Sequence, residues 1–140
     1  MIVGRTATAA GLGLAVAVLA GVGVSAIGRA HEPIVVQVTI HYSHFEAARI
    51  TVPAGRPVTF VIRNTDPIDH EWIVGDDASH ERHRTGTEPT HGARPTEVSI
   101  PAGAEIRTTV TFAATGSQRF ICHLPGHERY GMVGTVVVTR

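Results

Sequence analysis

The chain has 140 residues, of which 43% are hydrophobic and 17% charged, and its 12 acidic residues balance its 12 basic ones. That length suits one compact domain, and the zero net charge argues against a nucleic-acid partner. Nine histidines accompany a single cysteine, Cys122. One cysteine excludes an internal disulfide, a four-cysteine zinc site and a two-cysteine binuclear copper site.

Residues 1–30 have the composition of an export segment. Arg5 precedes an uncharged run over residues 6–28 that consists almost wholly of Ala, Val, Leu, Ile and Gly. A secretory signal peptide has this layout. The run is also long enough to cross a bilayer, so an uncleaved transmembrane anchor is the alternative. Both interpretations place residues 31–140 outside the cytoplasm, in the periplasm, at the outer face of the membrane or in the medium.

Residues 31–140 have the sequence pattern of an all-β domain. Apolar residues recur at every second position, as at Val58, Phe60 and Ile62, and turns rich in Pro, Gly, Asn and Asp separate the runs. The predicted strands cover residues 34–41, 48–52, 57–63, 70–74, 97–100, 105–112, 118–122 and 133–139. Short strands at this spacing predict a Greek-key β-sandwich of about seven or eight strands.

A polar segment at residues 75–95 interrupts this pattern. It contains His80, His83 and His91, and the chain after the export segment shows no helical period. Loops of this length in compact domains are usually functional or mobile, and a short helical turn fits within one. We therefore expect a polar, histidine-containing loop between two strands.

The segment from Cys122 to Met132 carries the strongest chemical signal. A thiol, an imidazole and a thioether follow one another at five-residue spacing, with His127 in the middle. A thiolate and an imidazole bind soft or borderline metals, and a weak thioether beside them favours copper over zinc or calcium. A trigonal site of one thiolate and two imidazoles needs a second histidine. His70 is the best candidate, because it follows a turn and starts a predicted strand.

This Cys-x4-His-x4-Met pattern near the carboxyl end, with an upstream histidine, resembles the type 1 blue copper proteins, the cupredoxins of the plastocyanin and azurin superfamily. The spacing is closest to that of rusticyanin and auracyanin, and the resemblance covers roughly residues 34–140. It implies one type 1 copper per chain that cycles between Cu(I) and Cu(II). The implied ligands are His70, Cys122 and His127 around the copper and Met132 on its axis.

Two positions bear on that resemblance. Glu71 stands where many cupredoxins have Asn, which leaves open how the ligands are oriented. His123 follows Cys122, as in the type 1 sites of multicopper oxidases, but the sequence has no His-x-His pair for a trinuclear centre. Six histidines are candidates for a second metal site or an electron path: His41, His44, His80, His83, His91 and His123. The simpler interpretation is that they belong to a solvated polar surface.

The sequence therefore predicts an exported, monomeric copper protein that transfers single electrons between redox partner proteins, with a carrier favoured over an enzyme. Electrons are expected to pass through the exposed edge of His127, ringed by Leu124, Pro125 and Met132. One alternative is a protein for copper storage, delivery or resistance that uses the histidine-containing loop as an acceptor. Another is a copper oxidoreductase similar to nitrite reductase, with additional copper bound at a subunit interface.

Overall fold

The computed structural model describes residues 34–86 and 91–140, and the predicted export segment lies outside them. Within these ranges no helix has the length and apolar character that a membrane crossing requires. The elements are β1 Ile34–His41, β2 His44–Phe45, β3 Arg49–Pro53, β4 Pro57–Asn64, β5 His70–Gly75, α1 Asp77–Thr85, β6 Glu97–Ile100, β7 Glu105–Thr111, β8 Gly116–Ile121 and β9 Val133–Thr139.

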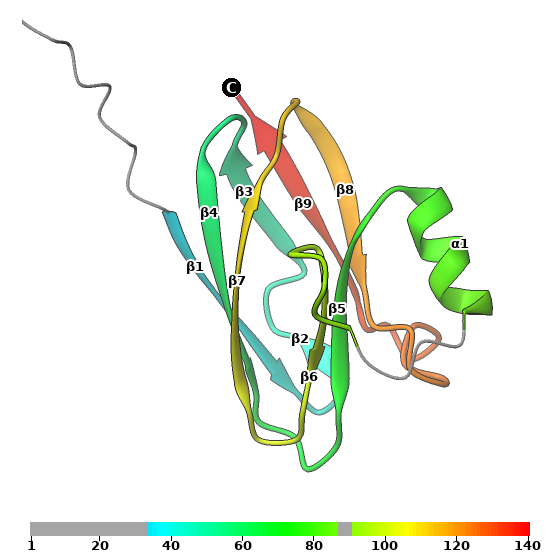
Figure 1. Cartoon of the computed structure of the whole chain (residues 1–140). Helices are drawn as coiled ribbons and strands as arrows, with labels where there is room; N and C mark the ends of the chain where they lie inside the picture. The colour runs from blue at the N-terminus through cyan, green and yellow to red at the C-terminus, as the bar shows by residue number, and fades with distance from the viewer. Residues whose placement is uncertain (1–33, 87–90) are drawn as a thin grey trace, which may run out of the picture.

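The strands form two sheets, ordered β2-β1-β4-β7 and β3-β9-β8-β5-β6. Figure 1 shows the sheets facing each other, with α1 on the outside beside β5 and β8. Most neighbours are antiparallel, while β1 pairs with β4 and β3 pairs with β9 in parallel. The predicted β-sandwich is therefore confirmed.

Three strand ends meet at one edge of the second sheet. β5 pairs antiparallel with β8, placing Ile73 opposite Ile121, and β8 pairs antiparallel with β9, placing Ile121 opposite Val133. Neighbouring antiparallel strands run in opposite directions, so one begins where the other ends. β5 therefore begins near the place where β8 ends and β9 begins. This register brings His70 next to the turn between β8 and β9.

Aromatic side chains pack between the two sheets. The rings of Phe60 and Trp72 have centroids 4.6 Å apart, and the ring of Phe45 meets that of Phe120 edge-on at 5.0 Å. Phe60, Trp72 and Phe120 have no exposed surface. Rings of this size bury large apolar areas, which is the dominant favourable term in folding. The strands that reach the site are thus anchored in a well-packed core.

The segment predicted as a polar loop contains a nine-residue helix, α1. The prediction that this segment holds no more than a short helical turn was therefore wrong. The side chain of Asp76 caps the helix by accepting a hydrogen bond from the backbone N–H of Ser79 at 2.8 Å. Only His80 of the helix is buried, so no apolar stripe marks it in the sequence. The strand β2 was also missed, because two residues are too few to show alternation.

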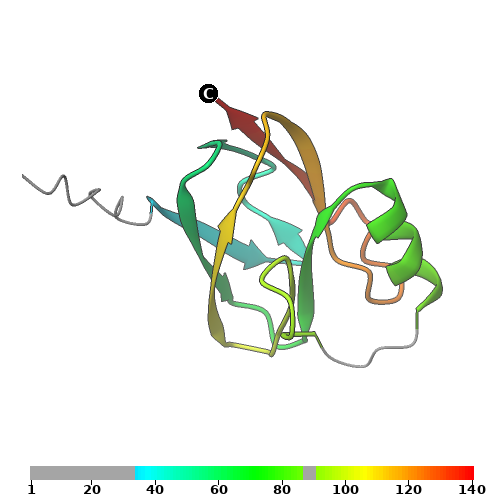
Figure 2. The ribbon, with the colours of Figure 1, turned by 45° about the horizontal axis from the view of Figure 1, so that its top comes forward.

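The helix packs on the turn between β8 and β9, as Figures 1 and 2 both show. Arg84 of α1 donates hydrogen bonds to both carboxylate oxygens of Glu128, at 2.9 and 2.7 Å. Nδ1 of His80 lies 3.0 Å from Nε2 of His123. The insert between β5 and β6 is therefore attached to the segment that carries three of the predicted ligands.

Candidate metal centre

Three predicted ligands converge where the strand ends meet. A nitrogen of His70, the sulfur of Cys122 and a nitrogen of His127 lie within 4.8 Å of one another. Nδ1 of His127 is 3.2 Å from Nδ1 of His70 and 3.2 Å from Sγ of Cys122. His70 and Cys122 are fully buried, and His127 is partly buried. The three donor atoms surround one point that a single metal ion can occupy.

Met132 lies at the same edge, fully buried and directly before β9. Its carbonyl accepts a hydrogen bond from the backbone N–H of Cys122 at 3.2 Å, and its N–H donates to the carbonyl of His127 at 3.0 Å. Gly126 and Gly131 adopt φ angles of 88° and 93°, which glycine takes without strain. The turn therefore holds the backbones of Cys122, His127 and Met132 side by side. We call His70, Cys122, His127 and Met132 the thiolate site.

Asp66 orients the imidazole of His70. Nε2 of His70 lies 2.9 Å from Oδ2 of Asp66, whose carboxylate also accepts the backbone N–H groups of Tyr42 and Ser43 at 2.7 Å each. Burial raises the pKa of Asp66, but the hydrogen bonds from Ser43, Tyr42 and His70 outweigh it and lower the pKa below its usual value. An ionised Asp66 accepts the Nε2 proton, which leaves the lone pair of His70 on Nδ1, facing Cys122 and His127. Sequence analysis missed this residue.

Glu71, the position where many cupredoxins have Asn, connects the thiolate site to its surroundings. Its backbone N–H donates to Sγ of Cys122 at 3.3 Å, and its Oε2 accepts the backbone N–H of His123 at 3.3 Å. Its other oxygen, Oε1, lies 3.4 Å from Nε2 of His91. The first two bonds fix the sulfur and the peptide that follows it. Glu71 therefore holds the cysteine segment with both its backbone and its carboxylate.

Burial changes the protonation of two donors in the metal-free site. Burial raises the pKa of the Cys122 thiol to about 11, although N–H groups of Leu124 and Glu71 lower it. Burial also lowers the pKa of His127, which keeps that imidazole neutral and able to donate a lone pair. A bound metal ion displaces the thiol proton. A buried sulfur, two imidazole nitrogens and a neighbouring thioether make a donor set that fits copper.

His127 is the one member of the thiolate site that is not fully buried. Leu124, Pro125 and Tyr130 line a pocket in the neighbouring surface, and Tyr130 is 71% exposed. The prediction that Met132 belongs to the surface rim was wrong, because Met132 has no exposed area. Tyr130 supplies the apolar surface that Met132 does not.

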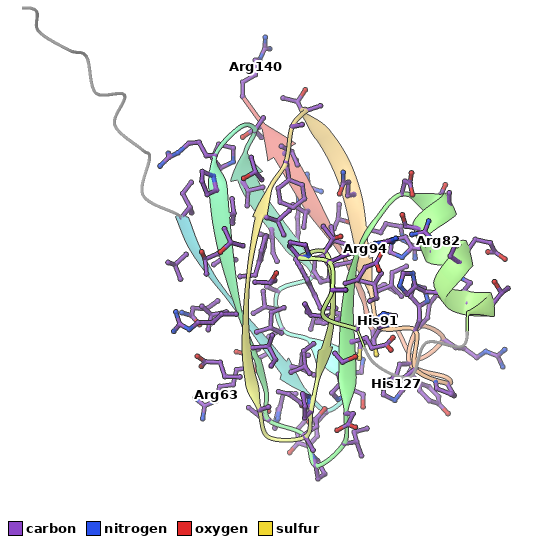
Figure 3. The ribbon with its side chains drawn as sticks, in the orientation of Figure 1. Arg63, Arg82, His91, Arg94, His127 and Arg140 are labelled. Atoms are coloured by element: carbon purple, nitrogen blue, oxygen red, sulfur yellow. The ribbon has the colours of Figure 1, made fainter. Side chains whose placement is uncertain are left out.

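The remaining predicted histidines divide into two groups. His41 and His44 pair across β1 and β2, where Nδ1 of His41 lies 2.8 Å from Oγ1 of Thr65. Among the described residues, neither of them belongs to a group of three metal-binding side chains. The other four gather between α1 and the second sheet, as a chain of neighbouring rings: His80, His123, His83 and His91. Figure 3 shows His91 and His127 on the side of the sandwich where α1 lies.

A family model for the cupredoxin-like domain matches residues 13–138. The chain belongs to the cupredoxin family. This cupredoxin is 41% identical over 98 residues to the copper-resistant cuproprotein CopI of Rubrivivax gelatinosus, in a match that covers 67% of this chain and 59% of that protein. The chain therefore spans less than two thirds of that relative's length. It is 27% identical over 135 residues to CopI of Pseudomonas aeruginosa, covering 74% of this chain and 75% of the relative.

Solved structures of blue copper proteins share the fold. Auracyanin B has a TM-score of 0.64 at 23% identity, over 79% of this chain and 92% of its own. Auracyanin from Roseiflexus castenholzii also has a TM-score of 0.64, at 21% identity, over 79% of this chain and all of its own. The predicted resemblance to cupredoxins is confirmed. Copper is the cofactor, since the family, the copper-protein relatives and the His–Cys–His group agree.

Proposed function

We propose that this cupredoxin is a type 1 copper protein that transfers single electrons between redox partners outside the cytoplasm. The convergence of one sulfur and two imidazole nitrogens within 4.8 Å carries the proposal. Met132 is the proposed axial ligand, and the export segment at residues 6–28 supports the location. Copper bound to such a donor set supplies a one-electron couple between Cu(I) and Cu(II).

The fold supports this role by holding the donors in place without the metal. Asp66 holds His70 at 2.9 Å. The N–H of Glu71 points at the sulfur of Cys122. The backbone N–H of His127 donates to the carbonyl of Leu124 at 3.0 Å. Because these contacts restrain His70, Cys122 and His127, the donors would move little when a copper ion between them gained or lost an electron.

His127 is the proposed route for the electron. It is the one partly exposed member of the thiolate site, and its loop neighbours Leu124, Pro125 and Tyr130 line a pocket in the surface. These three side chains can pack closely against a partner, and Arg84, Glu128 and Arg129, which line the same pocket, add charged groups to the proposed docking surface. A redox partner protein docked there would exchange its electron through the imidazole.

Voltammetry of the copper-loaded full chain tests the proposal. We expect a reversible one-electron response from one copper per chain. Cys122→Ser should remove this response. His44→Ala, which changes a surface histidine outside the site, should preserve it. A protein that holds copper at the thiolate site but shows no reversible couple would contradict the electron-transfer function.

A second candidate function is copper resistance, which the names of the two CopI relatives favour. In that role the protein would lower the free copper concentration outside the cytoplasm. Deletion of its gene should make the cell more sensitive to added copper, and the wild-type gene should restore growth where the Cys122→Ser gene does not. Unchanged copper tolerance in the deletion strain would remove this candidate.

A further inference from the structure

A second group of metal-binding side chains lies between α1 and the second sheet. His83 of α1, His91 of the segment before β6 and Glu97 of β6 place three donor atoms within 4.8 Å of one another. Their side chains are only 7%, 5% and 11% exposed. All three line one groove on the surface, so the donors are shielded yet reachable by an ion from solvent. We call these three residues the insert site.

The hydrogen bonds of His83 orient it as a ligand. Its Nδ1 lies 2.7 Å from the carbonyl oxygen of Ser79, which can only accept, so Nδ1 carries a proton. The lone pair of the neutral ring is then on Nε2, which lies 3.7 Å from Oε2 of Glu97. Either a proton on Nε2 or a metal ion between the two atoms would satisfy both of them. Metal-bound histidines are commonly held in this way, with the other nitrogen bonded to a carbonyl.

The charge around the insert site matches a divalent cation. Two buried carboxylates face its imidazoles: Glu97 faces His83, and Glu71 lies 3.4 Å from His91. Arg84 also lines the groove but pairs with Glu81 and Glu128. The arginines that pair with Glu97 are Arg82 and Arg94, which lie 3.4 and 3.0 Å from its other oxygen. Their side chains are 55% and 63% exposed, so water screens their charge. Figure 3 shows both arginines and His91 near α1.

We propose that the insert site binds one divalent cation of borderline hardness, such as Zn²⁺ or Cu²⁺. Two imidazoles and a carboxylate, with no sulfur, form a donor set that zinc and copper(II) both accept. The proposal is independent of the electron-transfer function, because none of the three donors belongs to the thiolate site.

The insert site is connected to the thiolate site by two residues. Glu71 donates its N–H to the sulfur of Cys122 and directs a carboxylate oxygen at His91. His123 follows Cys122 in the chain, and its ring stacks on that of His83 with centroids 5.7 Å apart and planes 20° apart. Glu71 therefore contacts both a proposed ligand of the insert site, His91, and the sulfur of the thiolate site.

Titration of the full chain carrying Cys122→Ser with Zn²⁺ tests the proposal, because this chain lacks the thiolate. Calorimetry should show one tightly bound Zn²⁺ per chain. His83→Ala, His91→Ala and Glu97→Gln, each added to that chain, should weaken binding by at least about tenfold. His44→Ala, the matched change at an exposed histidine outside the group, should leave the affinity unchanged. Equal affinity in the His91→Ala and parent chains would overturn the proposal.

A measurement without further substitution guards against variants that fail to fold. In a histidine-ring ¹H–¹⁵N spectrum of the Cys122→Ser chain, Zn²⁺ should shift Nε2 of His83 and leave its Nδ1 bonded to Ser79. The ring of His91 should shift at the same Zn²⁺ concentration. Shifts confined to His41 and His44, or no shifts at all, would overturn the proposal. If the copper-loaded wild-type protein proved colourless or redox-inactive, the electron-transfer proposal would fail, but the Zn²⁺ result for the insert site would stand.

Discussion

The thiolate site and the insert site lie at the same end of the protein but are built differently. Strand ends and one tight turn supply the thiolate site, while a helix, a connecting segment and a strand edge supply the insert site. The first includes a buried sulfur, and the second has only nitrogen and oxygen donors. Sulfur favours a soft ion, whereas imidazole and carboxylate favour a borderline one. One small sandwich thus presents two donor sets of different softness.

Removal of the sulfur should produce the largest effect and separate the two sites. Cys122→Ser is expected to abolish the strong visible absorption of the Cu(II) protein, because that absorption comes from thiolate-to-copper charge transfer. Zn²⁺ binding at the insert site should continue. Absorption spectroscopy and calorimetry on the same sample measure both, and parallel loss of the two would show that the sites are not independent.

Asp66→Asn should weaken the thiolate site next. An amide is a weaker acceptor for the Nε2 proton of His70 than the carboxylate, so the imidazole becomes a poorer donor and Cu(II) affinity should fall about 10–100-fold. Competition with a Cu(II) chelator measures the change. The control is Asp69→Asn, which makes the same chemical change at a carboxylate that accepts the backbone N–H of Ala102 instead. Equal losses in both variants would contradict an orienting role for Asp66.

Met132→Leu should alter the potential more than the colour. The substitution keeps the buried volume nearly constant, removes one donor and makes the site more apolar, which disfavours the more highly charged Cu(II). We expect the reduction potential to rise by roughly 60 mV or more, which is a tenfold shift towards Cu(I). Voltammetry measures it. An unchanged potential would exclude Met132 as the axial ligand.

Acid should destabilise the metal-free protein through the histidines beside α1. Burial lowers the pKa of His123 from 6.5 to about 4, and burial also lowers the pKa of His80. Between these pH values the unfolded chain binds a proton that the folded chain does not, so stability falls as the pH decreases from 6.5 towards 4. For His123 alone the loss from pH 7 to pH 5 is about 2 kcal/mol.

Urea unfolding of the metal-free protein at pH 7 and pH 5 measures that loss. His123→Gln should reduce the difference by about 2 kcal/mol, since glutamine does not titrate. His44→Ala serves as the control and should preserve it. A free energy of unfolding that is the same at both pH values would contradict the buried, neutral state of His123.

Sequence patterns revealed the strands and the thiolate-site spacing because both are local. Alternation predicted strand 97–100 with its observed bounds, and the interval from Cys122 to Met132 fits a turn between neighbouring strands. Asp66 was missed because its partners, Tyr42 and Ser43, lie more than twenty residues away and meet it only in the fold.

The insert shows the same limit. The histidines of residues 75–95 were visible as a polar group, but the sequence did not show that Glu97 and Glu71 would face them. α1 has no apolar stripe, so its position depends on polar contacts such as that between Arg84 and Glu128. Non-local polar contacts of this kind leave no periodic trace in a sequence.

The optical and electron paramagnetic resonance spectra of the copper-loaded full chain test the central claim most directly. With one equivalent of copper per chain, the account predicts intense visible absorption together with the resonance of a Cu(II) bound to sulfur and nitrogen, both lost in Cys122→Ser. A Cu(II) protein that is colourless, with copper bound to nitrogen and oxygen alone, would contradict it.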